Sequence, residues 1–136
     1  MGVDGEGTAV RDSTDLKRQN ILKRSFTYSL RAVKLYQYIQ EQKDGAGWII
    51  GKQYLRAATS IGANIEEAQA GESRSDFIHK LGVAQKEARE SLYWLRILSE
   101  SDLVPRNRLV PLIQETDELL NVIASIILST KRRVRN

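Results

Sequence analysis

Chemistry that this chain could perform centres on a short stretch around its only histidine, His79. Arg74 and His79 have the Arg-x4-His spacing that some helical ribonucleases of toxin systems carry in a small bundle. The motif is short and occurs often by chance, and a histidine exposed in the first turns of a helix is common. A ribonuclease that uses Arg74 and His79 is therefore the least favoured of the functions considered.

A metal site is also weakly supported by the sequence. Asp76 precedes His79 by three residues, which matches half of the carboxylate–histidine pattern of a di-iron bundle. Such a site needs a second histidine on another helix, and the sequence has none. There is no glycine-rich phosphate loop, and no hydroxyl nucleophile has a base at a matching spacing. We therefore expect a protein that is not an enzyme and holds no metal or cofactor.

The composition indicates one soluble domain. The chain has 136 residues, of which 41% are hydrophobic, and this is enough for a single core. It has no cysteine, and no apolar run approaches the roughly 18 residues that a membrane span requires. The N-terminus lacks the apolar region of a signal peptide. We expect a cytoplasmic protein without a membrane partner.

The elements that hold these residues are organised around residues 56–68, a helical stretch rich in small side chains. Ile61 and Ile65 share one face, and Asn64 lies at its edge, where a polar residue often fixes the register of packing. Gly62 costs a helix roughly 1 kcal/mol relative to alanine. We infer that this glycine allows a second helix to approach closely.

The expected partner of that face is a downstream seam whose residues recur in alternating steps of four and three. Its members are Phe77, Leu81, Ala84, Ala88, Ser91, Leu95 and Leu98. The middle of this seam is again small, so Gly62 is predicted to face the segment from Ala84 to Ala88.

Four helices with short connections are predicted, and there is no strand signal. They cover residues 16–42, 48–70, 73–100 and a last segment that starts between Pro105 and Pro111 and ends near residue 130. Residues 1–15 are predicted to be a disordered tail, residues 16–130 the bundle and residues 131–136 a basic tail. Short connections favour antiparallel neighbours, which gives an all-α, up-down-up-down four-helix bundle.

Two helices have more apolar residues than one core stripe requires. On the first helix, the side expected to face inward comprises Leu22, Phe26, Ser29, Val33 and Tyr36. Tyr28 and Leu35 form a second row there. On the fourth helix, a seam from Leu109 to Thr130 is accompanied by a row of Ile113, Leu120 and Ile127. This surplus predicts a homo-oligomer.

Basic residues gather at two places. The first helix has a stripe without any acid between Asp15 and Glu41, and the last six residues have a net charge of +4. The candidate nucleic-acid-binding residues are Lys17, Lys23, Arg24, Arg31 and Lys34 on the helix, with Lys131, Arg132, Arg133 and Arg135 at the C-terminus. From charge alone, a solvated helix face is the simpler interpretation.

Several motifs together resemble a known family. They are Thr-Ser-Ile-Gly-Ala-Asn-Ile-Glu-Glu-Ala at 59–68, Ser-Arg-Ser-Asp-Phe-Ile-His-Lys-Leu at 73–81, Lys-Glu-Ala-Arg-Glu at 86–90 and Tyr-Trp-Leu at 93–95. Arg-Ser-Phe at 24–26 and Val-Lys-Leu-Tyr at 33–36 agree with them. The sequence from about residue 20 to 130 resembles the bacterial four-helix-bundle proteins that are encoded in intervening sequences of 23S ribosomal RNA genes.

The resemblance implies a bundle that assembles into a homo-oligomeric ring, a pentamer, and it implies no catalytic residue. Relatives in the wider family are accessory proteins of diversity-generating retroelements, which present a basic surface to a reverse transcriptase and its RNA. The expected function is therefore non-catalytic binding of RNA, or of a reverse transcriptase-type nucleoprotein, through a basic surface. A purely structural or protein-interaction module is the alternative.

Overall fold

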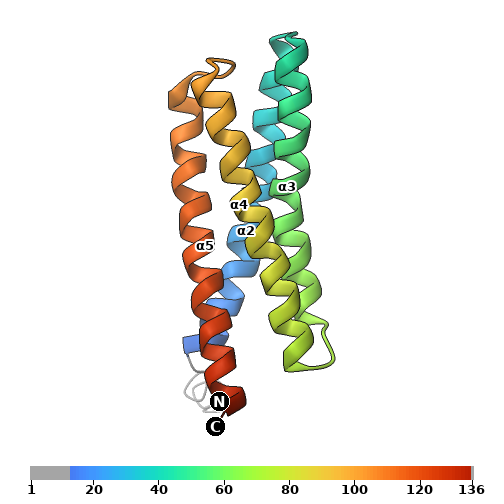
Figure 1. Ribbon diagram of the computed structural model, residues 1–136, viewed down its shortest axis with the longest axis vertical. Helices are drawn as coiled ribbons and strands as arrows, with labels where there is room; N and C mark the ends of the chain where they lie inside the picture. The colour runs from blue at the N-terminus through green and yellow to red at the C-terminus, as the bar shows by residue number, and fades with distance from the viewer. Residues whose placement is uncertain (1–12, 136) are drawn as a thin grey trace, which may run out of the picture.

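The structure, a computed structural model, describes residues 13–135, and within that range the chain is all-α with four helices and no strand. The helices are α2 (Ser13–Glu41), α3 (Gly45–Gln69), α4 (Arg74–Glu100) and α5 (Arg106–Arg135). They lie alongside one another, with the start of α2 and the end of α5 at the same end of the molecule (Figure 1). No helix in these residues is both long enough and apolar enough to span a membrane.

Helices α2 and α5 include residues of the two segments that were predicted as tails. Residues 1–12, most of the predicted N-terminal tail, lie outside the described residues, but Ser13 to Asp15 already belong to α2. At the other end, α5 continues through the basic segment to Arg135. The C-terminal cations therefore extend a helix rather than form a separate tail.

Side-chain caps fix where two helices begin. The Asp44 carboxylate accepts a hydrogen bond from the Gly47 N–H at 2.9 Å, so α3 starts at Gly45 and the predicted break over residues 44–47 is shorter. Ser73 Oγ accepts from the Asp76 N–H at 3.0 Å, which is the cap predicted for α4. Each cap satisfies a backbone donor that would otherwise lack a partner at a helix start.

The cores of α4 and α5 follow the seams predicted from their spacing. All seven residues of the α4 seam are buried, including Ala84 and Ala88 at its small middle. The buried residues of α5 are Leu109, Leu112, Thr116, Leu119, Ile123, Ile126 and Thr130. The second row of Ile113, Leu120 and Ile127 is half-buried against the same core. Part of the surface of this row therefore packs within the chain.

The inner face of α2 is rotated relative to the prediction. The residues that it buries are Ile21, Ser25, Tyr28, Ala32, Leu35 and Ile39. Phe26 and Val33, which were expected to face inward, are exposed, and Leu30 lies beside them. Aromatic and aliphatic residues occur on both sides of this helix, so its apolar pattern alone does not decide which side is buried.

Gly62 was predicted to pack against α4, but in the structure it packs against α2. A Cβ atom at this position would lie 3.3 Å from the Ser25 carbonyl oxygen and 3.4 Å from the hydroxyls of Ser25 and Ser29. Gly51, about three turns earlier on α3, faces the side chains of Tyr36 and Ile39 of α2 in the same way. The close approach that the glycine permits is thus between α2 and α3.

The other residues predicted to pack between α3 and α4 differ in how far they are buried. Ile61 and Ile65 are buried in the core, as are Phe77, Leu81 and Leu95 of α4. Asn64 is half-buried, and its Nδ2 donates to the Ser60 carbonyl of its own helix at 2.8 Å. The amide nitrogen therefore bonds within α3, and this contact does not itself join α3 to another helix.

A chain of hydroxyl groups crosses the core instead. Tyr54 OH on α3 donates to Tyr28 OH on α2 at 2.9 Å, and Tyr28 OH lies 2.5 Å from Thr116 Oγ1 on α5. Thr116 Oγ1 donates to the Leu112 carbonyl at 2.6 Å. Because that carbonyl can only accept, the protons run in one direction, from Tyr54 through Tyr28 to Thr116. Burial raises the pKa of both tyrosines.

Candidate nucleic-acid interface

The basic stripe of α2 is divided by the fold. Lys23 and Lys34 are exposed and Arg31 is half-exposed, as a surface stripe requires. The side chain of Lys17 lies outside the described residues. Arg24, in the middle of the stripe, is engaged by another helix, so the stripe is not continuous.

Arg24 forms an ion-pair clamp with α5. Its Nε and Nη2 donate to the two carboxylate oxygens of Glu115 at 3.0 and 2.8 Å, and Nη2 also donates to Glu118 at 2.8 Å. These hydrogen bonds, first those to Glu115, raise the pKa of Arg24 above its ordinary value. Two carboxylates neutralise the guanidinium, a pairing that the prediction of a nucleic-acid contact for Arg24 did not include. The reason is that its acidic partners lie on a different helix, which a plot of α2 alone does not include.

Arg31 and Lys34 meet a third cation at an open hollow between α2 and α5. The hollow has a volume of about 270 Å³, and its lining residues are Arg31, Lys34, Leu35, Arg108, Pro111 and Leu112. The guanidinium carbon of Arg108 lies 3.8 Å from the centre of the Tyr38 ring, a cation–π contact that holds the side chain across to α2. Three cations around an apolar floor form a place where a phosphate group would be attracted.

Arg108 was not among the residues predicted from the sequence. It lies at the start of the fourth helix, far from the basic stripe in the chain. The signal that could have found it is the pairing of the first and last helices, because an antiparallel partner brings residues near 108 beside those near 34.

The cations of the C-terminal segment are on the last turns of α5. Lys131, Arg132 and Arg133 are exposed, whereas the side chain of Arg135 lies outside the described residues. Among the lining residues of the α2–α5 hollow, as far as the described chain defines them, none comes from this segment. Lys131, Arg132 and Arg133 therefore do not line the hollow beside Arg31 and Lys34.

The residues considered for catalysis do not share one hollow. Arg74 is the first residue of α4 and lines one hollow with Arg18 and Arg133, whereas His79 lines another with Glu67 and Asp76. Among residues 13–135, no group of three or more histidine, aspartate or glutamate side chains is placed to hold a metal ion.

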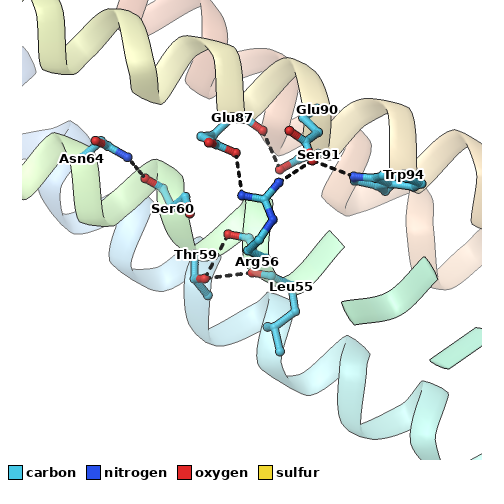
Figure 2. A network of polar contacts seen from close by, with 9 residues as sticks. All are labelled: Leu55, Arg56, Thr59, Ser60, Asn64, Glu87, Glu90, Ser91 and Trp94. Carbon is cyan, nitrogen blue, oxygen red and sulfur yellow. Dashed lines mark hydrogen bonds and ion pairs between the residues drawn. The ribbon is translucent and has the colours of Figure 1, made fainter. Parts of the chain in front are cut away.

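The α3–α4 surface has a polar network around Arg56 (Figure 2). Its guanidinium pairs with Glu90 and lies 3.5 Å from Glu87, both on α4. Trp94 Nε1 donates to the Glu90 carboxylate at 3.1 Å. The hydrogen bond from Trp94, and then that from Arg56, lower the pKa of Glu90. The charges of this network are thus paired between the two helices, unlike those at the α2–α5 hollow.

Lys80 and Glu67 form a second pair across the same two helices, 2.9 Å apart. The acids and Lys80 of these pairs belong to the motifs at 59–68, 73–81 and 86–90, and Arg56 lies three residues before the first of them. The motifs therefore join α3 to α4, on their buried side through small residues and on their exposed side through ion pairs.

Comparisons with known proteins agree on one family. A family model described as 23S rRNA-intervening sequence protein matches residues 17–125. A solved structure from Bacteroides thetaiotaomicron, described as a protein with unknown function from the S23 ribosomal protein family, is 38% identical. It covers 82% of this chain and 97% of its own, with a TM-score of 0.77. No curated protein sequence matches this one.

Proposed function

The chain belongs to the 23S rRNA-intervening sequence protein family, and from this premise we propose that it binds RNA without catalysing a reaction. The bundle is up-down-up-down, and copies assemble into a homo-oligomeric ring, expected to be a pentamer. A reverse transcriptase-type nucleoprotein is a second possible partner of the same surface. The relation to accessory proteins of diversity-generating retroelements is part of this proposal.

The observation that carries the proposal is the α2–α5 hollow. Arg31, Lys34 and Arg108 surround it, and the described lining contains no carboxylate that would neutralise them. Lysine and arginine side chains that contact phosphates supply most of the affinity of non-specific nucleic-acid binding. Leu35 and Leu112 in the same lining are buried, whereas Lys34 and Arg108 are exposed, so a phosphate backbone can reach these cations.

Assembly would multiply this modest patch. Phe26, Leu30 and Val33 form an exposed apolar stripe on α2, with 56%, 51% and 40% of their surface accessible. Such a stripe is suited to contact with a second copy. Linked copies bind one RNA with an avidity that exceeds that of a single patch. Light scattering of the purified protein measures the number of copies, and a monomer at all concentrations would contradict this part.

The test of RNA binding compares two triple variants that make the same change of charge. Arg31→Glu/Lys34→Glu/Arg108→Glu changes the hollow. Lys52→Glu/Arg89→Glu/Arg96→Glu changes exposed cations of α3 and α4 and is the control. Affinity for a structured RNA hairpin is measured from low to moderate salt by fluorescence anisotropy.

We expect the hollow variant to lose about two decades of affinity at low salt, and its salt dependence to flatten by roughly one unit of slope per lost phosphate contact. The control should bind within a few-fold of the wild type. Equal losses in both variants would mean that net charge alone drives binding. A wild-type protein that ignores RNA at low salt would favour the structural or protein-interaction alternative.

A further inference from the structure

A second cationic hollow lies at the end of the bundle where α2 starts and α5 ends. It has a volume of about 310 Å³ and is lined by residues of all four helices and of the α3–α4 connection. Arg18 of α2, Arg74 of α4 and Arg133 of α5 line it together. These three arginines are far apart in the sequence, so only the fold makes them one group. None of them lines the α2–α5 hollow.

Arg18 is held in place by packing. Its guanidinium carbon lies 4.1 Å from the centre of the Phe77 ring, and this stacking fixes the plane of the group. Its Nε atom is buried and, within the part of the chain that the structure describes, has no hydrogen-bond partner. A buried donor without an acceptor costs about 1–3 kcal/mol. An oxygen ligand in the hollow would remove that cost.

The charge of the lining selects the kind of ligand. Arg18 and Arg74 already outnumber the one carboxylate in the described lining, that of Glu72, so this lining is cationic without counting Arg133, which has a contact of its own. A phosphomonoester has a charge of about −1.5 to −2 at neutral pH, whereas an internal phosphodiester has a single charge. Guanidinium groups also bind phosphate through two parallel N–H···O bonds, which ammonium groups cannot do.

We propose that this hollow binds a phosphomonoester group, as found on a free nucleotide or at the 5′ end of an RNA strand. Arg18 and Arg74 donate to the phosphate oxygens, and Arg133 of α5 lines the same hollow. The site is separate from the α2–α5 hollow, and phosphate binding there does not require that the proposed RNA binding is correct. Recognition of an RNA end does rest on that proposed function.

The first experiment uses the full chain and adenosine monophosphate, with the Nε–H resonance of Arg18 followed by NMR. We expect this resonance to shift on titration. Arg74→Gln, at an exposed position, should weaken binding at least tenfold without unfolding the protein. Arg89→Gln, which removes an exposed arginine elsewhere on α4, should leave it unchanged. Adenosine, which lacks the phosphate, should give no shift.

A second experiment identifies the source of the phosphate. Two RNA oligonucleotides of one sequence are compared, one with a 5′-phosphate and one with a 5′-hydroxyl. Tighter binding of the phosphorylated strand, lost in Arg74→Gln, assigns the site to RNA ends; equal binding, together with a response to adenosine monophosphate, assigns it to free nucleotides. The inference is overturned if neither the nucleotide nor the 5′-phosphate has an effect. RNA that still binds through Arg31, Lys34 and Arg108 would then leave the proposed function intact.

Discussion

Helix α2 contacts its two neighbours in opposite ways. Against α3 it packs closely, because Gly51 and Gly62 present no side chain and the Ser25 backbone comes within contact distance. Against α5 the contact is less extensive and consists of separate parts: the Tyr28–Thr116 hydrogen bond, the Arg24 clamp and the hollow beside Arg31.

The difference teaches where charge on a bundle remains available. Where α3 and α4 pack through small residues, side chains such as Arg56 reach acids on the other helix and are neutralised. Where α2 and α5 are separated by larger residues such as Leu35 and Leu112, cations remain at the rim of a hollow. Because Arg24, at the same α2–α5 contact, is clamped by two carboxylates, it is the presence of an acid opposite each cation that decides which basic residues can serve a partner.

The largest expected effect comes from filling the close contact between α2 and α3. Gly62→Leu must push a side chain into the Ser25 backbone, and we expect a loss of about 3 kcal/mol in the free energy of unfolding. Gly82→Leu is the control, because a Cβ at Gly82 meets nothing within 4 Å. Urea denaturation measures both. Similar stabilities of the two variants would mean that α2 and α3 are not closely packed.

The next effect concerns the hydroxyl chain between α2 and α5. Thr116→Val removes the acceptor of the Tyr28 hydroxyl and leaves a buried donor unsatisfied, which should cost about 1–3 kcal/mol. Tyr54→Phe removes only the first donor of the chain and should cost less. If Tyr54→Phe proved the more destabilising in thermal melts, the direction assigned to the chain would be reversed.

A smaller effect is expected from the Arg24 clamp. Arg24→Gln should cost about 1 kcal/mol at low salt, because the pair is only partly buried, and high salt should reduce this difference. The same variant should leave RNA affinity nearly unchanged, whereas Arg31→Gln should lower affinity without lowering stability. If instead Arg24→Gln lowered RNA affinity and Arg31→Gln lowered stability, the basic stripe of α2 would act as one surface.

The smallest effect on stability at neutral pH is expected from ionisation of the buried tyrosines, and it increases at alkaline pH. Burial raises the pKa of Tyr28 and Tyr54 above the unfolded value of about 10. Their contribution to stability is therefore complete below pH of about 10 and is lost as the pH rises beyond it. Unfolding of the wild type and of Tyr54→Phe between pH 9 and 11 measures this. The variant should lose stability less steeply.

The sequence predicted the helices better than it predicted their partners. The alternating spacing from Phe77 to Leu98 identified the buried face of α4 because a single apolar stripe leaves no choice. On α2, Phe26 and Tyr28 offer two competing stripes, and the structure buries the one with Tyr28, whose hydroxyl has partners on α3 and α5. Gly62 indicated a close contact with a second helix. The small residues of α4 suggested that this helix is α4, whereas the structure places α2 against the glycine.

Only part of the candidate site was predicted, because the rest depends on contacts between helices. Arg31 and Lys34 could be selected from their own helix, because a basic stripe is visible in one segment. Whether a cation on that stripe remains available depends on residues about 90 positions away, such as Glu115 beside Arg24. Arg108 was missed because it becomes a neighbour of Lys34 only when α5 packs beside α2.

The three hydroxyls in the interior also bear on how this protein can diverge. If α2, α3 or α5 slid by one residue, at least one of these groups would be left without its partner in an apolar setting, so misaligned arrangements are penalised. Surface charges can then differ between relatives while the register of the helices stays the same. Surfaces suited to different partners could evolve on one unchanged frame.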